Sequence, residues 1–240
     1  MGAMAALARV DVKNVSRDSL TRFLIAYPFL LGLLFRYLVP LADQRLEATF
    51  DLTPYYPLIV GFFGILITSS LAGYVIGFLL LDERDDHTLL ALRVTPLTMQ
   101  RYLTYRLLTP VLIGLAAAFI AIPLMDLMEL PYLKLLPITL VAALMAPIFA
   151  LLLAALASNK VQGFAVMKGL GLLFLAPFAA WFIAEPWQFL LGLFPTYWPV
   201  KAFWVMLDGG NWGWFLLAGV VVSFVWIGVL LRRFERVAFR

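Results

Sequence analysis

The sequence predicts an all-α integral membrane protein with six membrane-spanning helices in one transmembrane domain (1–240). Hydrophobic residues make up 64% of the 240 residues, charged residues only 13%, and the mean hydropathy is +0.96. A soluble domain of this size could not cover so much apolar surface. Six apolar runs reach the roughly 20 residues that a helix needs to cross a bilayer: 23–41, 57–81, 107–125, 135–157, 162–184 and 212–231.

Basic residues predict the orientation of these spans. Six spans place both termini on one side, and the segments on that side carry fourteen of the eighteen Lys and Arg residues. Because Lys and Arg concentrate in cytoplasmic loops, both termini and the segment 82–106 are expected to be cytoplasmic. This bias also explains the sequence pI of about 9.4 without nucleic acid as a partner.

The N-terminal segment, 1–22, precedes the first apolar run and is predicted to hold a surface helix. On a helical wheel Arg9, Lys13 and Arg17 share one side, whereas Ala8 and Val12 share another. Such a weakly amphipathic helix would lie at the cytoplasmic interface as an elbow before the first span. A solvated tail is the alternative.

The segment 82–106 is the longest strongly charged stretch between two apolar runs. It opens with an acidic cluster, 82–87, and continues with residues 88–93, which can form a short helix. Thr95 is then a suitable N-cap with Pro96 at the first helical position, which predicts a second short helix leading into the third span. This order of elements favours a docking element on the membrane face over a solvated loop.

Two further connections have distinct patterns. The fourth and fifth runs are separated only by residues 158–160, which predicts a tight hairpin. The external segment 185–211 is rich in aromatic residues and is divided by Pro195 and Pro199. Each half is too short to span, so the pattern predicts a short external or re-entrant helical hairpin before the last span.

Catalytic motifs are missing from the sequence. It contains no P-loop, no H-E-x-x-H, no G-x-S-x-G, no cysteine and a single histidine. This excludes the usual nucleotide-binding loop and histidine-pair or thiolate metal sites. Two alternatives stay open: an enzyme that modifies lipid within the membrane, and a membrane subunit without transport activity. The enzyme would need a polar catalytic cluster, and none is evident in the sequence.

A few polar residues do interrupt the apolar runs. Thr68 and Ser69 lie in the middle of the second run with Tyr74 nearby, and Lys168 lies about six residues into the fifth. Polar groups within spans are candidates for a transport path. The alternatives are helix packing for the small and hydroxylated residues and snorkelling to the interface for the lysine.

The segment from Asp82 to Leu92, followed by Val94-Thr95-Pro96-Leu97 and Tyr102-Leu103, resembles the cytoplasmic loop of ABC-2-type exporter permeases. The stretch 159–163, followed by Met167-Lys168, is similar to small bacterial permeases of the fluoroquinolone-export type. The likeness covers nearly the whole chain. Two departures are His87, where the family often has glycine, and Gln162, where an acidic residue is common.

The resemblance implies a half-transporter in a bacterial or archaeal inner membrane. A second permease subunit, identical or different, would pair with it, and separate ATP-binding subunits would bind the ATP and Mg, so that this chain holds no cofactor of its own. The cargo implied is amphipathic or hydrophobic: a drug, lipid or peptide. The loop would be a coupling helix that contacts the ATPase through Asp82, Glu83, Arg84, Asp85, Asp86, His87, Thr88, Leu89, Leu92, Thr95 and Pro96.

Overall fold

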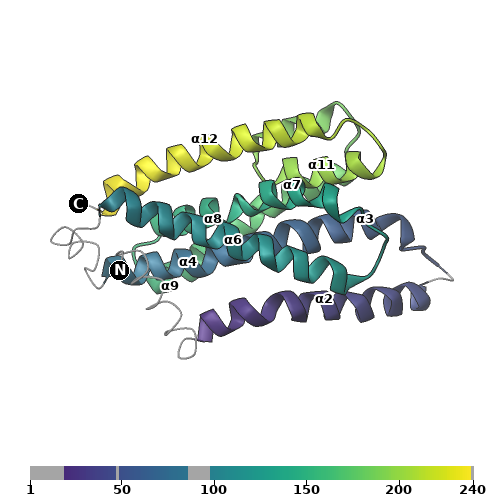
Figure 1. Cartoon of the computed structure of the whole chain (residues 1–240), viewed down its shortest axis with the longest axis horizontal. Coiled ribbons are helices and arrows are strands. Elements are labelled where there is room, and N and C mark those ends of the chain that lie inside the picture. The colour runs from purple at the N-terminus through teal and green to yellow at the C-terminus, as the bar shows by residue number, and fades with distance from the viewer. Residues whose placement is uncertain (1–18, 47–48, 86–97, 239–240) are drawn as a thin grey trace.

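The computed structural model describes residues 19–46, 49–85 and 98–238, and all regular structure in these ranges is helical. Figure 1 shows the long helices running side by side along one axis. The start of α2, the end of α4, the start of α6 and the end of α12 lie at one end of this bundle, which we call the basic end. Most of the expected elbow helix (1–22) and the middle of the expected coupling segment lie outside the described residues.

Six helical stretches of the described chain are long and apolar enough to cross a membrane, which confirms the predicted fold class. α2 (Ser19–Leu46), α6 (Met99–Met125) and α12 (Gly213–Ala238) are single helices. The other three are composite: η1 (Thr53–Tyr55), α3 (Tyr56–Ile59), η2 (Val60–Ile67) and α4 (Thr68–Asp85); α7 (Tyr132–Ala143) and α8 (Met145–Leu156); and α9 (Lys160–Leu170), η4 (Gly171–Phe174) and α10 (Leu175–Phe182). The helices extend past several predicted span ends because charged residues continue them into the interface.

The second span contains a π-helix, η2, which hydropathy did not predict. Where η2 passes into α4, the Thr68 hydroxyl donates a hydrogen bond of 2.7 Å to the Phe63 carbonyl. The Tyr27 hydroxyl of α2 donates to the Thr68 carbonyl over 2.6 Å. In a lipid environment backbone groups must be satisfied within the protein, so Tyr27 joins the first span to this junction.

α8 forms the centre of the bundle. In the apolar 18-residue stretch of its span, Tyr132–Leu156, 89% of the residues are buried, whereas the corresponding share in the α12 span is 17%. α4 packs so closely on α8 that a Cβ atom at Gly73 would lie 2.2 Å from the Ala146 carbonyl oxygen. Gly114 of α6 allows a similar approach, since its Cβ would lie 2.2 Å from the Ser69 carbonyl oxygen. Small residues thus bring α4 against two neighbours, as is usual for helices in membranes.

The segment between α10 and α12 folds into two short helices, η5 (Trp187–Leu193) and α11 (Tyr197–Leu207), as its two halves predicted. α11 is mostly buried and packs against α7 and α12. Its Lys201 is 8% exposed, pairs with Glu185 and lies 5.9 Å from the centre of the Phe215 ring. This hairpin is therefore built into the end of the bundle opposite the basic end.

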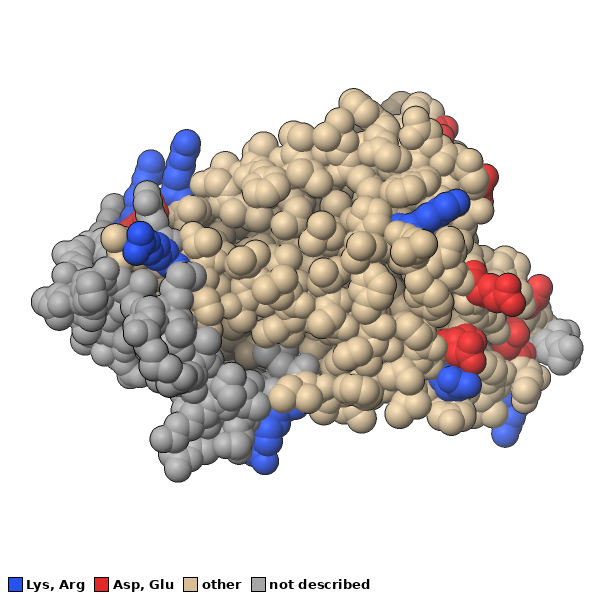
Figure 2. Space-filling model, in the orientation of Figure 1, with Lys and Arg blue, Asp and Glu red and all other residues tan. Residues whose placement is uncertain are grey.

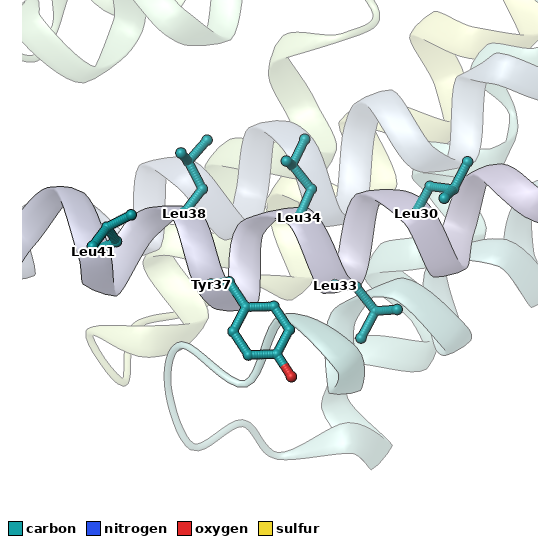
Figure 3. A pocket seen from close by; sticks show the side chains of 6 residues that line it. All are labelled: Leu30, Leu33, Leu34, Tyr37, Leu38 and Leu41. Atoms are coloured by element: carbon teal, nitrogen blue, oxygen red, sulfur yellow. The ribbon is translucent and has the colours of Figure 1, made fainter.

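The surface has a broad apolar belt between two charged ends. In Figure 2 Lys and Arg lie toward both ends, the red acidic residues lie mainly at the end opposite the basic end, and the face between them is largely uncharged. α2 contributes a shallow apolar groove, shown in Figure 3, lined by Leu30, Leu33, Leu34, Tyr37, Leu38 and Leu41. Such a belt fits a protein that crosses a membrane several times.

Candidate functional site

A buried ion pair joins the end of α4 to the start of α6 at the basic end. Arg106 of α6 pairs with Glu83 of α4, and the side chains are only 5% and 13% exposed. Tyr102, one turn before Arg106, donates its hydroxyl hydrogen to the same Glu83 carboxylate. Arg106 Nε lies 3.3 Å from the Tyr102 oxygen and donates to it. Three side chains therefore satisfy one another where α4 and α6 meet.

Neighbouring residues of α4 hold the same end against the α8–α9 hairpin. The Arg84 guanidinium donates to the Ala154 carbonyl over 3.0 Å and to the Ala157 carbonyl over 2.7 Å. Both carbonyls are at the C-terminal end of α8, where the helix leaves carbonyls unpaired and where the dipole favours a cation. Asp82 adds an ion pair of 2.8 Å to Lys160, the first residue of α9, although this pair is solvent-exposed.

The hairpin that receives these contacts has its own cap. The Asn159 side chain accepts a hydrogen bond of 3.0 Å from the Gln162 backbone N–H. The Gln162 side-chain oxygen in turn accepts from the Ser158 N–H over 2.6 Å and from its hydroxyl over 2.5 Å. Gln162 thus performs a capping role that needs an acceptor oxygen and no charge, which explains how it can stand where an acidic residue is common.

These contacts form one unit, the basic-end cluster: Asp82, Glu83, Arg84, Tyr102, Arg106, Lys160 and the carbonyls of Ala154 and Ala157. The cluster brackets residues 86–97, because α4 ends just before them and α6 begins just after. A force on that segment would reach α4, α6, α8 and α9 together. The Glu83–Arg106 link is nearly buried, so separating its two charges in a poorly solvated site would cost free energy.

The comparisons with known proteins identify the family. The model of the Rv2686c-like fluoroquinolones export permease proteins matches residues 11–231. The chain belongs to this family. The fluoroquinolones export permease proteins MT2760 and Rv2686c, from the CDC 1551 / Oshkosh and H37Rv strains of Mycobacterium tuberculosis, are each 37% identical to it over 238 residues, covering 97% of this chain and 94% of theirs. No solved structure matches. The resemblance to fluoroquinolone-export-type permeases is thereby confirmed, and this permease is a multi-pass membrane protein.

Part of the expected coupling segment of this permease can be described. Asp82, Glu83, Arg84 and Asp85 form the last turn of α4, and the first three take part in the basic-end cluster. Asp86, His87, Thr88, Leu89, Leu92, Thr95 and Pro96 lie outside the described residues. α6 begins at Met99 with Thr98 as its N-cap, whose hydroxyl accepts from the Arg101 N–H. The described cap thus lies three residues after the one expected at Thr95.

The four candidate path residues are not brought together within the permease. Thr68 and Ser69 are fully buried, and Ser69 Oγ is the one buried side-chain polar atom among the described residues without a hydrogen-bond partner. Tyr74 packs with its ring centre 5.0 Å from that of Phe149. Lys168 lies on the exposed side of α9. A path role for these residues stays a prediction.

Three side chains of the cluster, those of Tyr102, Arg106 and Lys160, were not among the candidate site residues chosen from the sequence. Tyr102 was noted only as part of the family-like pattern, and Arg106 only as a basic residue near a span. A signal was present, because residues four apart on a helix share a face, and an arginine within a span-forming helix needs a partner. Which acidic residue would supply the partner depends on how α4 and α6 pack.

Proposed function

We propose that this chain is the membrane-spanning permease subunit of an ATP-driven ABC exporter. A separate ATP-binding subunit binds ATP and Mg and supplies hydrolysis, and a second permease, identical or different, completes the membrane path. The chain itself carries no ATPase motif and needs no cofactor. Both termini face the cytoplasm of a bacterial or archaeal cell, and the ATP-binding subunit docks at the basic end.

The observation that carries this proposal is the basic-end cluster. A permease that does not hydrolyse ATP itself must receive the energy of hydrolysis through contact with its ATPase. The segment 86–97 is flanked on both sides by residues that connect α4, α6, α8 and α9. The Glu83–Arg106 pair joins α4 to α6, and the two Arg84 hydrogen bonds join α4 to the end of α8. A displacement of the segment by a docked ATPase would therefore move these helices together. Family membership supports export as the outcome of that movement.

The cargo proposed is an amphipathic or hydrophobic small molecule. The relatives are named for export of fluoroquinolones, which combine fused aromatic rings with charged groups. Among the described residues no acidic side chain lies deep within a span: those within the span-forming helices are near their ends. This distribution favours a path driven by ATP over one coupled to protons or ions, which uses carboxylates within the membrane.

The proposal is tested by transport into inside-out vesicles that contain the permease together with the ATPase from the same cells. Accumulation of a fluoroquinolone is compared with ATP, with a non-hydrolysable ATP analogue, and with a proton gradient alone. ATP-dependent uptake that persists when the proton gradient is dissipated supports the proposal. Uptake that follows the proton gradient and ignores ATP would contradict it.

A further inference from the structure

Lys168 is a cation placed two turns inside a span without a partner. It is exposed on α9, and among the described residues it makes no ion pair or hydrogen bond through its side chain. Two other cations within the described span helices do have partners: Arg36 pairs with Asp126 over 2.9 Å, and Arg106 pairs with Glu83. A cation in this position either reaches the interface or binds an anion.

Lys168 lies deeper in its span than the other lysine of α9, Lys160. It lies eight positions after Lys160, which marks the basic end of α9 through its ion pair with Asp82. At the helical rise this places the two Cα atoms about 12 Å apart along the axis. The Lys168 side chain leans toward the helix N-terminus, as helical side chains do, so the ammonium lies between the level of its own Cα and the basic end, in the inner half of the span.

The residues one turn away on either side complete an amphipathic surface. Phe164 and Leu172, four residues before and after Lys168, share its face of the span, and both are exposed, at 51% and 68%. The Phe164 ring is supported from beneath by Phe78, with ring centres 4.7 Å apart. Ring, cation and aliphatic side chain thus follow one another along α9.

The same surface is open to a flat molecule. A Cβ atom at Gly169 or Gly171 would meet nothing within 4 Å. The α-helix also ends here, because α9 changes to the 3₁₀ turn η4 at Gly171. An aromatic body can therefore lie against the backbone beside Lys168 without displacing a side chain.

We infer that the face of α9 formed by Phe164, Lys168 and Leu172 is a binding site for amphipathic cargo that carries a carboxylate. The ammonium binds the carboxylate, Phe164 stacks on the aromatic part, and Leu172 contacts the apolar remainder. Such a molecule supplies the exposed Lys168 ammonium with an anion, which apolar lipid chains cannot do. The inference rests on the proposed export function and adds to it the chemical class of the cargo.

The test measures binding of a fluoroquinolone carboxylic acid and its methyl ester to the full-length permease in phosphatidylcholine nanodiscs, using intrinsic drug fluorescence. The wild type should bind the acid about tenfold more tightly than the ester, the factor that corresponds to about 1.4 kcal/mol. Lys168→Gln should abolish this preference, and Lys168→Arg should keep most of it. Lys134→Gln, which removes an exposed lysine from the other end of the bundle, should leave the preference unchanged.

Three results would overturn the inference. The acid preference survives in Lys168→Gln, or the wild type does not discriminate acid from ester, or Lys168→Gln loses bound phosphatidylglycerol in native mass spectrometry while its acid preference stays. The last result would assign Lys168 to a lipid phosphate. The exporter proposal is judged separately: ATP-driven transport of acid and ester at equal rates would uphold it while rejecting this site.

Discussion

Arg106 of α6 and Glu83 of α4 form a buried ion pair 23 positions apart in sequence, on the two sides of the segment expected to contact an ATPase. Tyr102 donates to the same carboxylate, so this part of the site is nearly closed to solvent. The pair thereby connects the end of α4, before the segment, to the start of α6, after it. Its removal should affect stability and coupling together.

Replacing either charge alone should destabilise the permease. Glu83→Gln or Arg106→Gln removes the opposite charge from beside a nearly buried ionised side chain, a change that typically costs about 3–5 kcal/mol. The fraction of protein that remains monodisperse after heating in detergent measures the loss. The double variant Glu83→Gln/Arg106→Gln should be more stable than either single variant. If both single variants kept wild-type stability, the pair would not exist in the folded protein.

Arg84 should matter for coupling more than for folding. Arg84→Gln loses two charge-assisted hydrogen bonds to the end of α8 and should loosen the link between α4 and the α8–α9 hairpin. ATP-dependent transport should fall several-fold, while drug binding to the isolated permease stays unchanged. Arg233→Gln removes an exposed arginine from α12 at the same end and serves as the matched control. Equal effects of the two variants would argue for a general loss of positive charge.

Gly73 should tolerate no side chain. Gly73→Val places a Cβ within 2.2 Å of the Ala146 carbonyl oxygen and must separate α4 from α8. The expected cost is about 3 kcal/mol, at the upper end for overpacking, and is measured as lost yield of folded protein. Gly228→Ala on α12, where a Cβ meets nothing within 4 Å, should be harmless. Normal yield of Gly73→Val would rule out the close contact of α4 with α8.

Gln162 should be replaceable by glutamate but not by leucine. Glutamate keeps the acceptor oxygen that binds Ser158, whereas leucine removes it and should cost about 1 kcal/mol, as for the loss of a helix cap. Thermal stability in detergent compares the two variants. Should Gln162→Leu be as stable as Gln162→Glu, the cap would contribute nothing and the role of this position would have to be sought elsewhere.

Much of the architecture could be predicted from the sequence because lipid imposes strict rules on span length and charge. Six spans, the tight turn at 158–160 and the two short helices before the last span all follow from hydropathy and proline placement. The π-helix η2 could not be predicted this way, since its residues are as apolar as those of an ordinary span. The hydrogen bond from Tyr27 of α2 to the Thr68 carbonyl, directly after η2, likewise depends on how α2 packs.

The site was less accessible to sequence reasoning. The acidic cluster indicated that Asp82 and Glu83 matter, but a sequence pattern does not state which basic residues approach them. Arg106 and Lys160 do so only because α6 and the α8–α9 hairpin pack against the end of α4. Such pairings are set by tertiary structure, which also buries Thr68 and Ser69 of α4 and leaves Lys168 exposed on α9.

The most direct test of the central claim is purification of the permease from native membranes in mild detergent, with quantitative mass spectrometry of the proteins that accompany it. We predict an ATP-binding subunit in stoichiometric amount, much of which is lost when Asp85 and Asp86 are both replaced by lysine. The mass of the complex should also reveal a second permease subunit. A preparation that transports drug but contains no ATP-binding subunit would contradict the account.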